Sequence, residues 1–274
     1  EAEIILFEKG EHISFANCGL PYYIGGVINS KDKLLVQTPE KMKERFRIDV
    51  RIYSEVTKID TVNKKVEILD HAQNKVYTES YDKLILSPGA EPIRPKLPGI
   101  DSKRIFTLRN IHDAFKIKDY VVRMNPRRAV VVGAGFIGLE VAENLHLSDV
   151  KVTVVELADH VIGPLDYEMA AFVHQHMKTK NVEFYLKDAV EAFEDGDAWV
   201  NVKLSSGRTL KADMVIMGIG VRPESKIAKE AGLTIGKTGG ILVDEYMRTS
   251  NEDIYAVGDA VEVKDFVSGK EALI

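Results

Sequence analysis

The chain has 274 residues, a formal net charge of −5, and a composition that is 45% hydrophobic and 29% charged. These proportions are typical of a globular protein with sizeable cores, and the acidic balance argues against nucleic acid or an anionic membrane surface as a partner. A single cysteine, Cys18, excludes an intrachain disulfide framework and a cysteine-rich metal site, and it favours a reducing, cytoplasmic location. We expect no metal site. We also expect no membrane span, because glycines interrupt the longest apolar run.

The N-terminal stretch begins with a short apolar strand and then carries the cysteine. EIILFE ends in Glu8, a carboxylate at the carboxyl end of the predicted strand. SFANCGLPYYIGG follows, in which Cys18 precedes Pro21, a residue tolerated in the first turn of a helix. A thiol at a helix N-terminus is favoured as the reactive thiolate. Ser14 and Asn17 place a hydroxyl and an amide nearby, for substrate contact or for local turn hydrogen bonds.

The next segments read as strands and turns. Residues 56–82 alternate as antiparallel strands do. YDKLILSPGA then predicts a buried strand that runs into a tight turn at Ser87, Gly89 and Ala90, and such a turn alone is more often structural than functional. Arg109 follows in TLRN, where it either bridges two domains or lies on the surface.

The clearest motif lies between residues 129 and 156, where AVVVGAGFIGLEVAENLHLSDVKVTVVE predicts strand, glycine turn, helix and strand. Gly133 allows the turn, Gly135 lets the backbone approach a pyrophosphate, and Gly138 lets helix and strand pack closely. The helix N-terminus then offers free N–H groups to phosphates. The motif therefore predicts a dinucleotide site, with Phe136 and Ile137 in its loop.

Two carboxylates accompany this motif. Glu156 closes the second strand, 18 residues beyond Gly138, where it can accept hydrogen bonds from ribose hydroxyls and would repel a 2′-phosphate. NADH is therefore expected rather than NADPH, although NADPH stays open. Glu140, early in the helix, lies near the nicotinamide or is an ordinary first-turn carboxylate.

Two later strand ends complete the pattern. MGIG places Gly218 and Gly220 at a strand end near the same pocket. TSNEDIYAVGD runs into Gly258 and Asp259, a glycine and a carboxylate that suit a sugar-alcohol chain and that occur equally in ordinary turns.

Taken together, the glycine motif, the SPGA turn and TSNEDIYAVGD resemble the FAD-dependent pyridine nucleotide-disulfide oxidoreductases. SFANCGLPYYIGG resembles their single-cysteine branch, the coenzyme A disulfide reductases, which include forms fused to a rhodanese domain. The resemblance implies an α/β fold with two Rossmann-like three-layer domains. FAD would bind residues 1–107 plus 248–274, and NAD(P)H an inserted domain at 108–247. It also implies a first phosphate loop upstream, and a C-terminal domain, absent here, that forms a homodimer.

The resemblance further implies roles for the residues singled out above. Cys18 would be the nucleophile and redox centre, with Ser14 and Asn17 contacting the substrate. The residues expected to bind or line the cofactors are Glu8, Asn17, Cys18, Ser87, Gly89, Ala90, Arg109, Gly133, Gly135, Phe136, Ile137, Gly138, Glu140, Glu156, Gly218, Gly220, Gly258 and Asp259.

A protein with one reactive cysteine cannot store two electrons as an internal disulfide. Its oxidised form is a mixed disulfide with a small thiol, a persulfide or a sulfenic acid. The resemblance favours coenzyme A disulfide or persulfide as the substrate. Three alternatives remain: an NADH oxidase or peroxidase that cycles through sulfenic acid, a truncated non-catalytic nucleotide-binding module, and a reductase that passes electrons to a protein.

Overall fold

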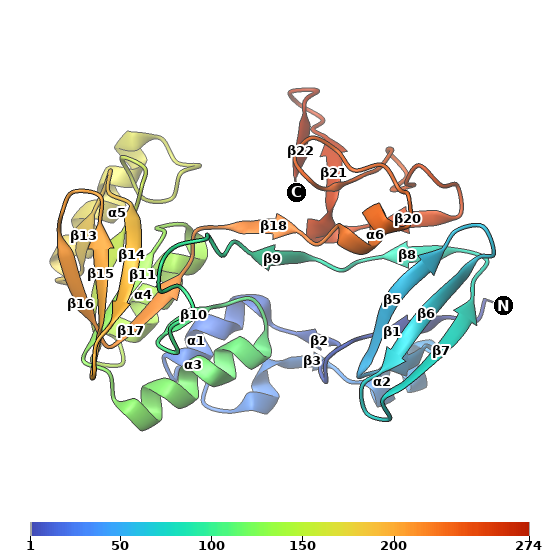
Figure 1. Cartoon of the computed structure of the whole chain (residues 1–274), viewed down its shortest axis with the longest axis horizontal. Coiled ribbons are helices and arrows are strands. Elements are labelled where there is room, and N and C mark those ends of the chain that lie inside the picture. Colours follow the sequence, from blue (N-terminus) through green and yellow to red (C-terminus); the bar gives the residue numbers. More distant parts are fainter. Residues whose placement is uncertain (1, 274) are drawn as a thin grey trace. The chain divides into compact units, whose positions relative to one another are not determined.

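The computed structural model describes residues 2–273, and its internal contacts divide the chain into two compact units. Unit 1 consists of Glu1–Ser14, Gln37–Glu91 and Val221–Ile274, and unit 2 of Phe15–Val36 and Pro92–Gly220. Figure 1 labels most of the helices and strands of both units. Two short strand pairs lie where the chain passes from one unit to the other. They are β2 (Ser14–Phe15) with β3 (Leu35–Gln37), and β9 (Ala90–Pro92) with β18 (Val221–Pro223).

Unit 2 is built around a parallel five-stranded sheet with the strand order β10, β17, β11, β12, β13. Its strands are β10 (Ile105–Thr107), β17 (Met214–Met217), β11 (Arg128–Val132), β12 (Lys151–Val155) and β13 (Glu183–Tyr185). The central strand β11 is almost wholly buried, as expected for β-branched residues covered on both faces. Because the sheet is parallel, the carboxyl ends of all five strands lie at one edge.

The two faces of this sheet pack against different layers. Val131 and Ile216 share a core cluster with residues of α1 (Leu20–Ile24), α3 (Ile111–Met124) and α4 (Phe136–His146). Val130 and Val215, one residue along, share another with the antiparallel sheet of β14 (Val190–Asp195), β15 (Val200–Leu204) and β16 (Thr209–Ala212). Alternation of side chains along each strand thus produces three layers.

Local sequence signals set the helices of unit 2. A capping box begins α3, in which the Asn110 side chain accepts from the backbone N–H of Asp113 at 3.0 Å and the Asp113 carboxylate accepts from the N–H of Asn110. The amphipathic helix α5 (Tyr167–Thr179) buries His174, whose Nε2 accepts from the N–H of Val161 at 3.2 Å. Burial lowers the pKa of His174, which matches a neutral packing residue.

Unit 1 contains several small sheets around its own core. Two of them are parallel pairs, β1 (Ile5–Phe7) with β4 (Asp49–Arg51) and β8 (Leu84–Leu86) with β20 (Ile254–Ala256). The others are β5 (Ser54–Asp60), β6 (Lys65–Asp70) and β7 (Lys75–Ser80), and β19 (Ile241–Leu242), β21 (Val261–Lys264) and β22 (Glu271–Leu273). The helices are α2 (Pro39–Phe46) and α6 (Lys226–Glu230).

The predicted α/β fold class is confirmed, and so are the antiparallel strands expected at residues 56–82. The domain limits expected from the sequence were drawn by which cofactor each part would bind. The two units are defined instead by contacts within the chain, and they differ from those limits, since Phe15–Val36 lies in unit 2. Those limits stay a prediction. Within residues 2–273, no helix is long and apolar enough to cross a bilayer.

Candidate functional site

The glycine loop of unit 2 is closed so tightly that two of its glycines have no room for a side chain. A Cβ atom at Gly133, where φ is +95°, would lie 2.3 Å from the carbonyl oxygen of Gly218. A Cβ at Gly138 would lie 2.1 Å from the carbonyl oxygen of Gly133. At Gly135, by contrast, a Cβ would meet nothing within 4 Å. Gly133 and Gly138 therefore serve packing, and Gly135 leaves open space beside the loop.

Glu156 is held against this loop by hydrogen bonds from the backbone. One carboxylate oxygen accepts from the N–H of Ala134 at 2.6 Å, and the other accepts from the N–H of Ala158 at 2.8 Å. Each carboxylate oxygen can accept more than one hydrogen bond, so both can still accept from ribose hydroxyls. The carboxylate is thus fixed in place beside the glycine turn before any ligand arrives.

Other residues predicted from the sequence share the same edge of the sheet. Gly218 and Gly220 follow β17, and the N–H of Gly218 donates to the carbonyl of Val132 at 2.7 Å. Arg109 follows β10, which pairs with β17, and its backbone N–H donates to Asp113 at 3.0 Å. Phe136 and Ile137 are exposed at the start of α4. The structure therefore places these residues at the edge of the sheet that carries the glycine loop, where the pyridine nucleotide is expected to bind.

Glu140 lies four residues after Phe136, the first residue of α4, and is half-buried. Burial raises the pKa of its carboxyl, and the neighbouring Glu143 raises it further. This group is therefore more easily protonated than an ordinary glutamate.

These features suit a pyridine nucleotide. Gly135 is the N-cap of the eleven-residue helix α4 and provides no side-chain cap, so the first-turn N–H groups have no side-chain acceptor at the cap position. An N-terminus of this kind attracts a pyrophosphate, and the open space at Gly135 admits one. Glu156 would hold the ribose.

The predicted FAD residues of unit 1 also converge, at the carboxyl ends of the neighbouring parallel strands β8 and β20. The N–H of Val257 donates to the carbonyl of Leu86 at 2.9 Å, which brings the turn at Ser87 and Gly89 beside Gly258 and Asp259. Gly89 and Gly258 have φ angles of +76° and +77°, the left-handed region that favours glycine. Ser87, Gly258 and Asp259 are exposed, whereas Ala90 is buried.

Glu8 follows β1 and accepts a hydrogen bond from the N–H of Gly10 at 2.7 Å. Its own N–H donates to the carbonyl of Arg51 at the end of β4. The Glu8 carboxylate is half-buried and has one local partner, which is compatible with binding the ribose of FAD. The backbone at Gly258 is open, because a Cβ there would meet nothing within 4 Å, and this is compatible with the sugar-alcohol part of FAD.

Cys18 is exposed and lies in a 3₁₀ turn, Asn17–Gly19, directly before α1. The expected helix after the cysteine is present but only five residues long, with Pro21 in its first turn. Asn17 is exposed beside Cys18 in unit 2, whereas Ser14 belongs to unit 1 and to strand β2. The preference for thiolate stays a prediction.

Unit 1 also contains a pair of carboxyl groups that the sequence does not indicate. The N–H of Glu224 donates to the carbonyl of Gly89 at 2.9 Å, and the pairing of β9 with β18 brings Glu224 near Glu91. A hydrogen bond with Glu91, followed by burial, raises the pKa of Glu224, while Arg222 lies 3.5 Å from Glu91. No local signal could have found this pair, since its members lie far apart in the sequence.

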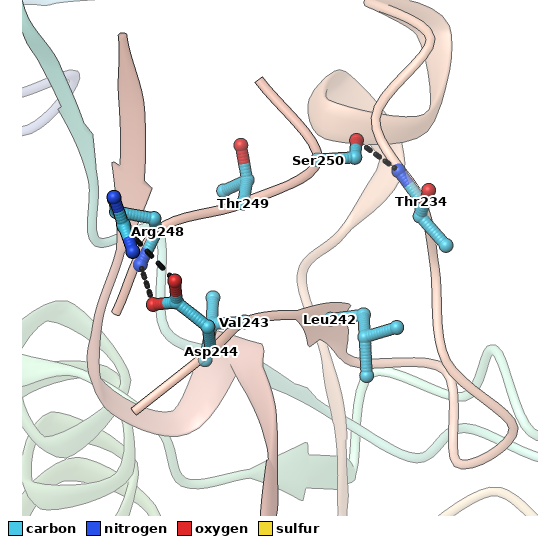
Figure 2. Close-up of a pocket in the computed structure, with 7 residues that line it drawn as sticks. All are labelled: Thr234, Leu242, Val243, Asp244, Arg248, Thr249 and Ser250. Atoms are coloured by element: carbon cyan, nitrogen blue, oxygen red, sulfur yellow. Dashed lines mark hydrogen bonds and ion pairs between the residues drawn. The ribbon is translucent and has the colours of Figure 1, made fainter. Parts of the chain in front are cut away.

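A hollow of about 320 Å³ in unit 1 lies apart from these residues (Figure 2). Figure 2 shows the Asp244–Arg248 ion pair, at 2.9 Å, on one side and the bond from the Thr234 N–H to Ser250 Oγ, at 3.0 Å, on the other. Four of its lining residues bind one another in these two pairs, and none of the residues predicted from the sequence lines it. It therefore adds nothing to the candidate site.

Comparison with known protein families identifies the family of the whole chain. The family described as pyridine nucleotide-disulphide oxidoreductase matches residues 1–271. The chain belongs to this family. The family is one of FAD-dependent enzymes that use NADH or NADPH, so the resemblance stated from the sequence is confirmed at this level.

Two curated relatives in this oxidoreductase family differ in the reaction that their names state. The chain is 38% identical over 274 residues to an NADH oxidase of Methanocaldococcus jannaschii, covering 100% of this chain and 60% of that protein. It is 35% identical over 261 residues to a coenzyme A disulfide reductase of Staphylococcus epidermidis, covering 95% of this chain and 58% of that protein. The chain therefore spans less than two thirds of either relative.

Solved structures of oxidoreductases agree with the whole described fold. The reduced CoADR-RHD of Bacillus anthracis is 53% identical with a TM-score of 0.97, over 100% of this chain and 49% of that one. An NAD-dependent persulfide reductase from A. fulgidus is 39% identical with a TM-score of 0.95, over 100% and 51%. A water-forming NADH oxidase from Lactobacillus brevis, bound to NADH, is 31% identical with a TM-score of 0.93, over 100% and 60%.

Proposed function

We propose that this protein is an FAD-dependent oxidoreductase that uses NADH to reduce coenzyme A disulfide or coenzyme A persulfide through Cys18. The observation that carries the proposal is an exposed, solitary cysteine in a chain of this family. With no second cysteine available, the oxidised sulfur must pair with something outside the chain. Relatives named coenzyme A disulfide reductase and persulfide reductase support a small thiol-derived acceptor.

The reaction needs one protein thiol, and Cys18 is the only thiol in this chain. The Cys18 thiolate attacks one sulfur of coenzyme A disulfide, which forms a mixed disulfide with Cys18 Sγ and releases one coenzyme A thiolate. With coenzyme A persulfide, attack on the sulfur attached to coenzyme A gives the same mixed disulfide and releases hydrosulfide. Two electrons then cleave the bond between Cys18 Sγ and the coenzyme A sulfur, and a proton completes the released thiol. Bound FAD supplies the transfer of that electron pair from NADH to sulfur.

The remaining residues would bind and orient. The open backbone at Gly135 and the uncapped N-terminus of α4 would receive the pyrophosphate of NADH. Glu156, already fixed by Ala134 and Ala158, would accept hydrogen bonds from its ribose. In unit 1, Glu8 would hold the adenosine ribose of FAD, and Gly258 and Asp259 its sugar-alcohol chain.

The second candidate is an NADH oxidase or peroxidase, in which oxygen or peroxide oxidises Cys18 to a sulfenic acid. It is favoured by the Methanocaldococcus relative named NADH oxidase, which is 38% identical to this chain, whereas the coenzyme A disulfide reductase of Staphylococcus epidermidis is 35% identical. Sulfenic acid forms on exposed thiolates, and Cys18 is exposed. Both candidates use the same residues, so only the acceptor separates them.

Steady-state NADH consumption by the natural holoenzyme tests the proposal. Coenzyme A disulfide, coenzyme A persulfide, hydrogen peroxide and oxygen are compared as acceptors. We expect the first two to support the fastest turnover, and Cys18→Ser to abolish that turnover while NADH still bleaches the flavin band. Faster turnover with oxygen or peroxide supports the second candidate instead. If the natural protein is isolated without a flavin band, binds NADH and turns over none of the four acceptors, it is a nucleotide-binding module.

The homodimer and the cytoplasmic location expected from the sequence belong to the same proposal. The dimer is checked by sedimentation of the natural holoenzyme, in which a monomer at working concentration contradicts it. NADH and NADPH are compared as electron donors in the same assay, and we expect NADH to give the higher kcat/KM because Glu156 would repel a 2′-phosphate.

A further inference from the structure

The short helix that follows Cys18 is packed into unit 2 between two of its longer helices. α1 begins two residues after Cys18 and contacts both α3 and α4, and Figure 1 shows α1 beside α3. Leu20 and Ile24 of α1 are buried in the same cluster as Ile117 of α3 and Leu145 of α4. The Tyr23 ring meets Phe115 edge-on, with centroids 5.5 Å apart. The cysteine segment is therefore a part of unit 2 and not a loose loop.

Two side chains hold the far end of α1. The ammonium of Lys118, on α3, donates to the carbonyl oxygen of Ile24 at 2.9 Å. The hydroxyl of Ser148, just past α4, shares its one proton between the carbonyl oxygen of Gly25, at 3.2 Å, and that of Asn144, at 3.0 Å. The last carbonyls of a helix have no partner within the helix, so these donors satisfy groups that would otherwise need water.

Gly25 also lies in direct contact with α4. A Cβ there would be 2.5 Å from Asn144 Oδ1 and 2.9 Å from the Asn144 carbonyl oxygen, so only glycine allows this approach. Asn144 is fully buried, and its amide Nδ2 donates to the carbonyl of Glu140 at 2.8 Å. Among the described residues, Asn144 Oδ1 has no hydrogen-bond partner. A buried amide oxygen left in this state is costly, so close packing at Gly25 must favour its position.

We propose that Lys118 and the Gly25–Asn144 contact are positioning elements for Cys18. Lys118 fixes the cysteine segment to α3, and the Gly25–Asn144 contact fixes it to α4, the helix that begins at the glycine loop of the dinucleotide site. The thiol would then keep one position relative to the nucleotide-binding helix, as a reacting group held by a rigid scaffold must. The inference rests on the proposed function for its link to turnover, but the position of Cys18 can be measured without turnover.

The test compares Lys118→Met with Lys116→Met in the natural holoenzyme. Lys116 is exposed on the same helix two residues away, and it serves as the matched control. The primary readout is the rate constant for alkylation of Cys18 by iodoacetamide, measured across pH. We expect Lys118→Met to change this rate several-fold, Lys118→Arg to restore it by keeping a donor, and Lys116→Met to match wild type.

The second readout is turnover with coenzyme A disulfide. A displaced thiol should lower kcat by about tenfold in Lys118→Met while the KM for NADH stays unchanged, because misplacement of a reacting group acts on the chemical step. Gly25→Ala should show the same pattern. Its control is Gly163→Ala in the same unit, where a Cβ meets nothing within 4 Å.

The alkylation rate of Cys18 tests whether Lys118 positions the thiol. A wild-type alkylation rate in Lys118→Met, or an equal change in Lys116→Met, overturns it, even if thermal stability falls. Should Gly25→Ala fail to fold, the three lysine variants still give the answer. If Cys18→Ser keeps full turnover, the proposed function fails, whereas the alkylation result still shows whether Lys118 positions the thiol.

Discussion

The two units present an acidic residue at the end of a parallel strand in different settings. In unit 2, Glu156 follows a strand of a continuous five-stranded sheet and accepts from Ala134 within the glycine turn at 2.6 Å. In unit 1, Glu8 follows one strand of a two-stranded pair and accepts from Gly10, two residues further along its own turn, at 2.7 Å.

This difference shows what makes a strand-end carboxylate ready for a ribose. Glu156 is tied to a separate segment, so the glycine turn, the carboxylate and the N-terminus of α4 have fixed mutual positions before a ligand binds. The Glu8 carboxylate accepts its hydrogen bond from its own turn. We expect changes in unit 2 to affect both stability and ligand affinity, and changes in unit 1 to affect mainly affinity.

The largest effect is expected at Gly138. Gly138→Ala brings a Cβ to 2.1 Å from the Gly133 carbonyl oxygen, and overpacking against backbone should lower the free energy of unfolding by about 3 kcal/mol. Gly135→Ala is the matched variant, because its Cβ meets nothing within 4 Å and should weaken NADH binding with little loss of stability. Urea unfolding and NADH titration measure the two effects. Equal unfolding midpoints would remove the distinction between packing and ligand-facing glycines.

The next effect is expected at Asp213, which anchors β11 of the unit 2 sheet. Its carboxylate accepts from the N–H groups of Arg127 and Arg128, each at 2.9 Å, and from the Arg128 guanidinium at 2.8 Å. Burial alone would raise its pKa, but these hydrogen bonds outweigh burial and lower it. Asp213→Asn should cost about 2 kcal/mol at neutral pH.

The pH dependence of this effect has a definite sign. Because the folded-state pKa of Asp213 is depressed, its contribution is present above the ordinary value of 3.8 and is lost as pH falls through the folded-state pKa. The difference between wild type and Asp213→Asn should therefore shrink in acid. Asp253 of unit 1 also has a lowered pKa, because the ammonium groups of Lys64 and Lys83 bind its carboxylate. Asp253→Asn should cost less, because both lysine side chains are exposed and pairs with solvated ammonium groups contribute little. The reverse order would contradict the comparison.

The smallest effects are expected at the two strand-end carboxylates, Glu156 and Glu8. Glu156→Gln should weaken NADH binding by about tenfold and lower stability by about 1 kcal/mol, because it disturbs the tie to Ala134. Glu8→Gln should leave stability nearly unchanged and weaken FAD retention. Differential scanning calorimetry, NADH titration and flavin release measure these changes. A stability loss in Glu8→Gln as large as that in Glu156→Gln would mean that both carboxylates are tied equally well.

Features that depend on neighbours in the sequence could be predicted. The β-branched strand before Gly133, the glycine spacing and the acidic residue ending KVTVVE predict a unit whose contacts are mostly local to one strand–helix–strand segment. The structure places Glu156, Gly218 and the loop together as that pattern requires. The helix expected after Cys18 is also present, but it is shorter than a proline-led start suggests, because it ends at Gly25 against α4.

Contacts between distant side chains could not be predicted in the same way. Lys118 and Ile24, Asp213 and Arg127, and Glu91 and Glu224 lie far apart in the sequence, and no periodicity or motif marks their pairing. Lysine on an amphipathic helix ordinarily faces water, and only the packing of α1 on α3 gives Lys118 a carbonyl to bind. By the inference above, the Lys118 contact positions Cys18, while the motif around Cys18 indicates only its chemistry.

An anaerobic single-turnover experiment tests the central claim most directly. Natural holoenzyme and its Cys18→Ser variant are each reduced with NADH and then mixed with coenzyme A disulfide, and free coenzyme A thiol is counted. Wild type should release both halves of the disulfide as thiol for each NADH oxidised, whereas the variant should accept electrons from NADH and release none. Release of thiol by Cys18→Ser at the wild-type rate would contradict the account.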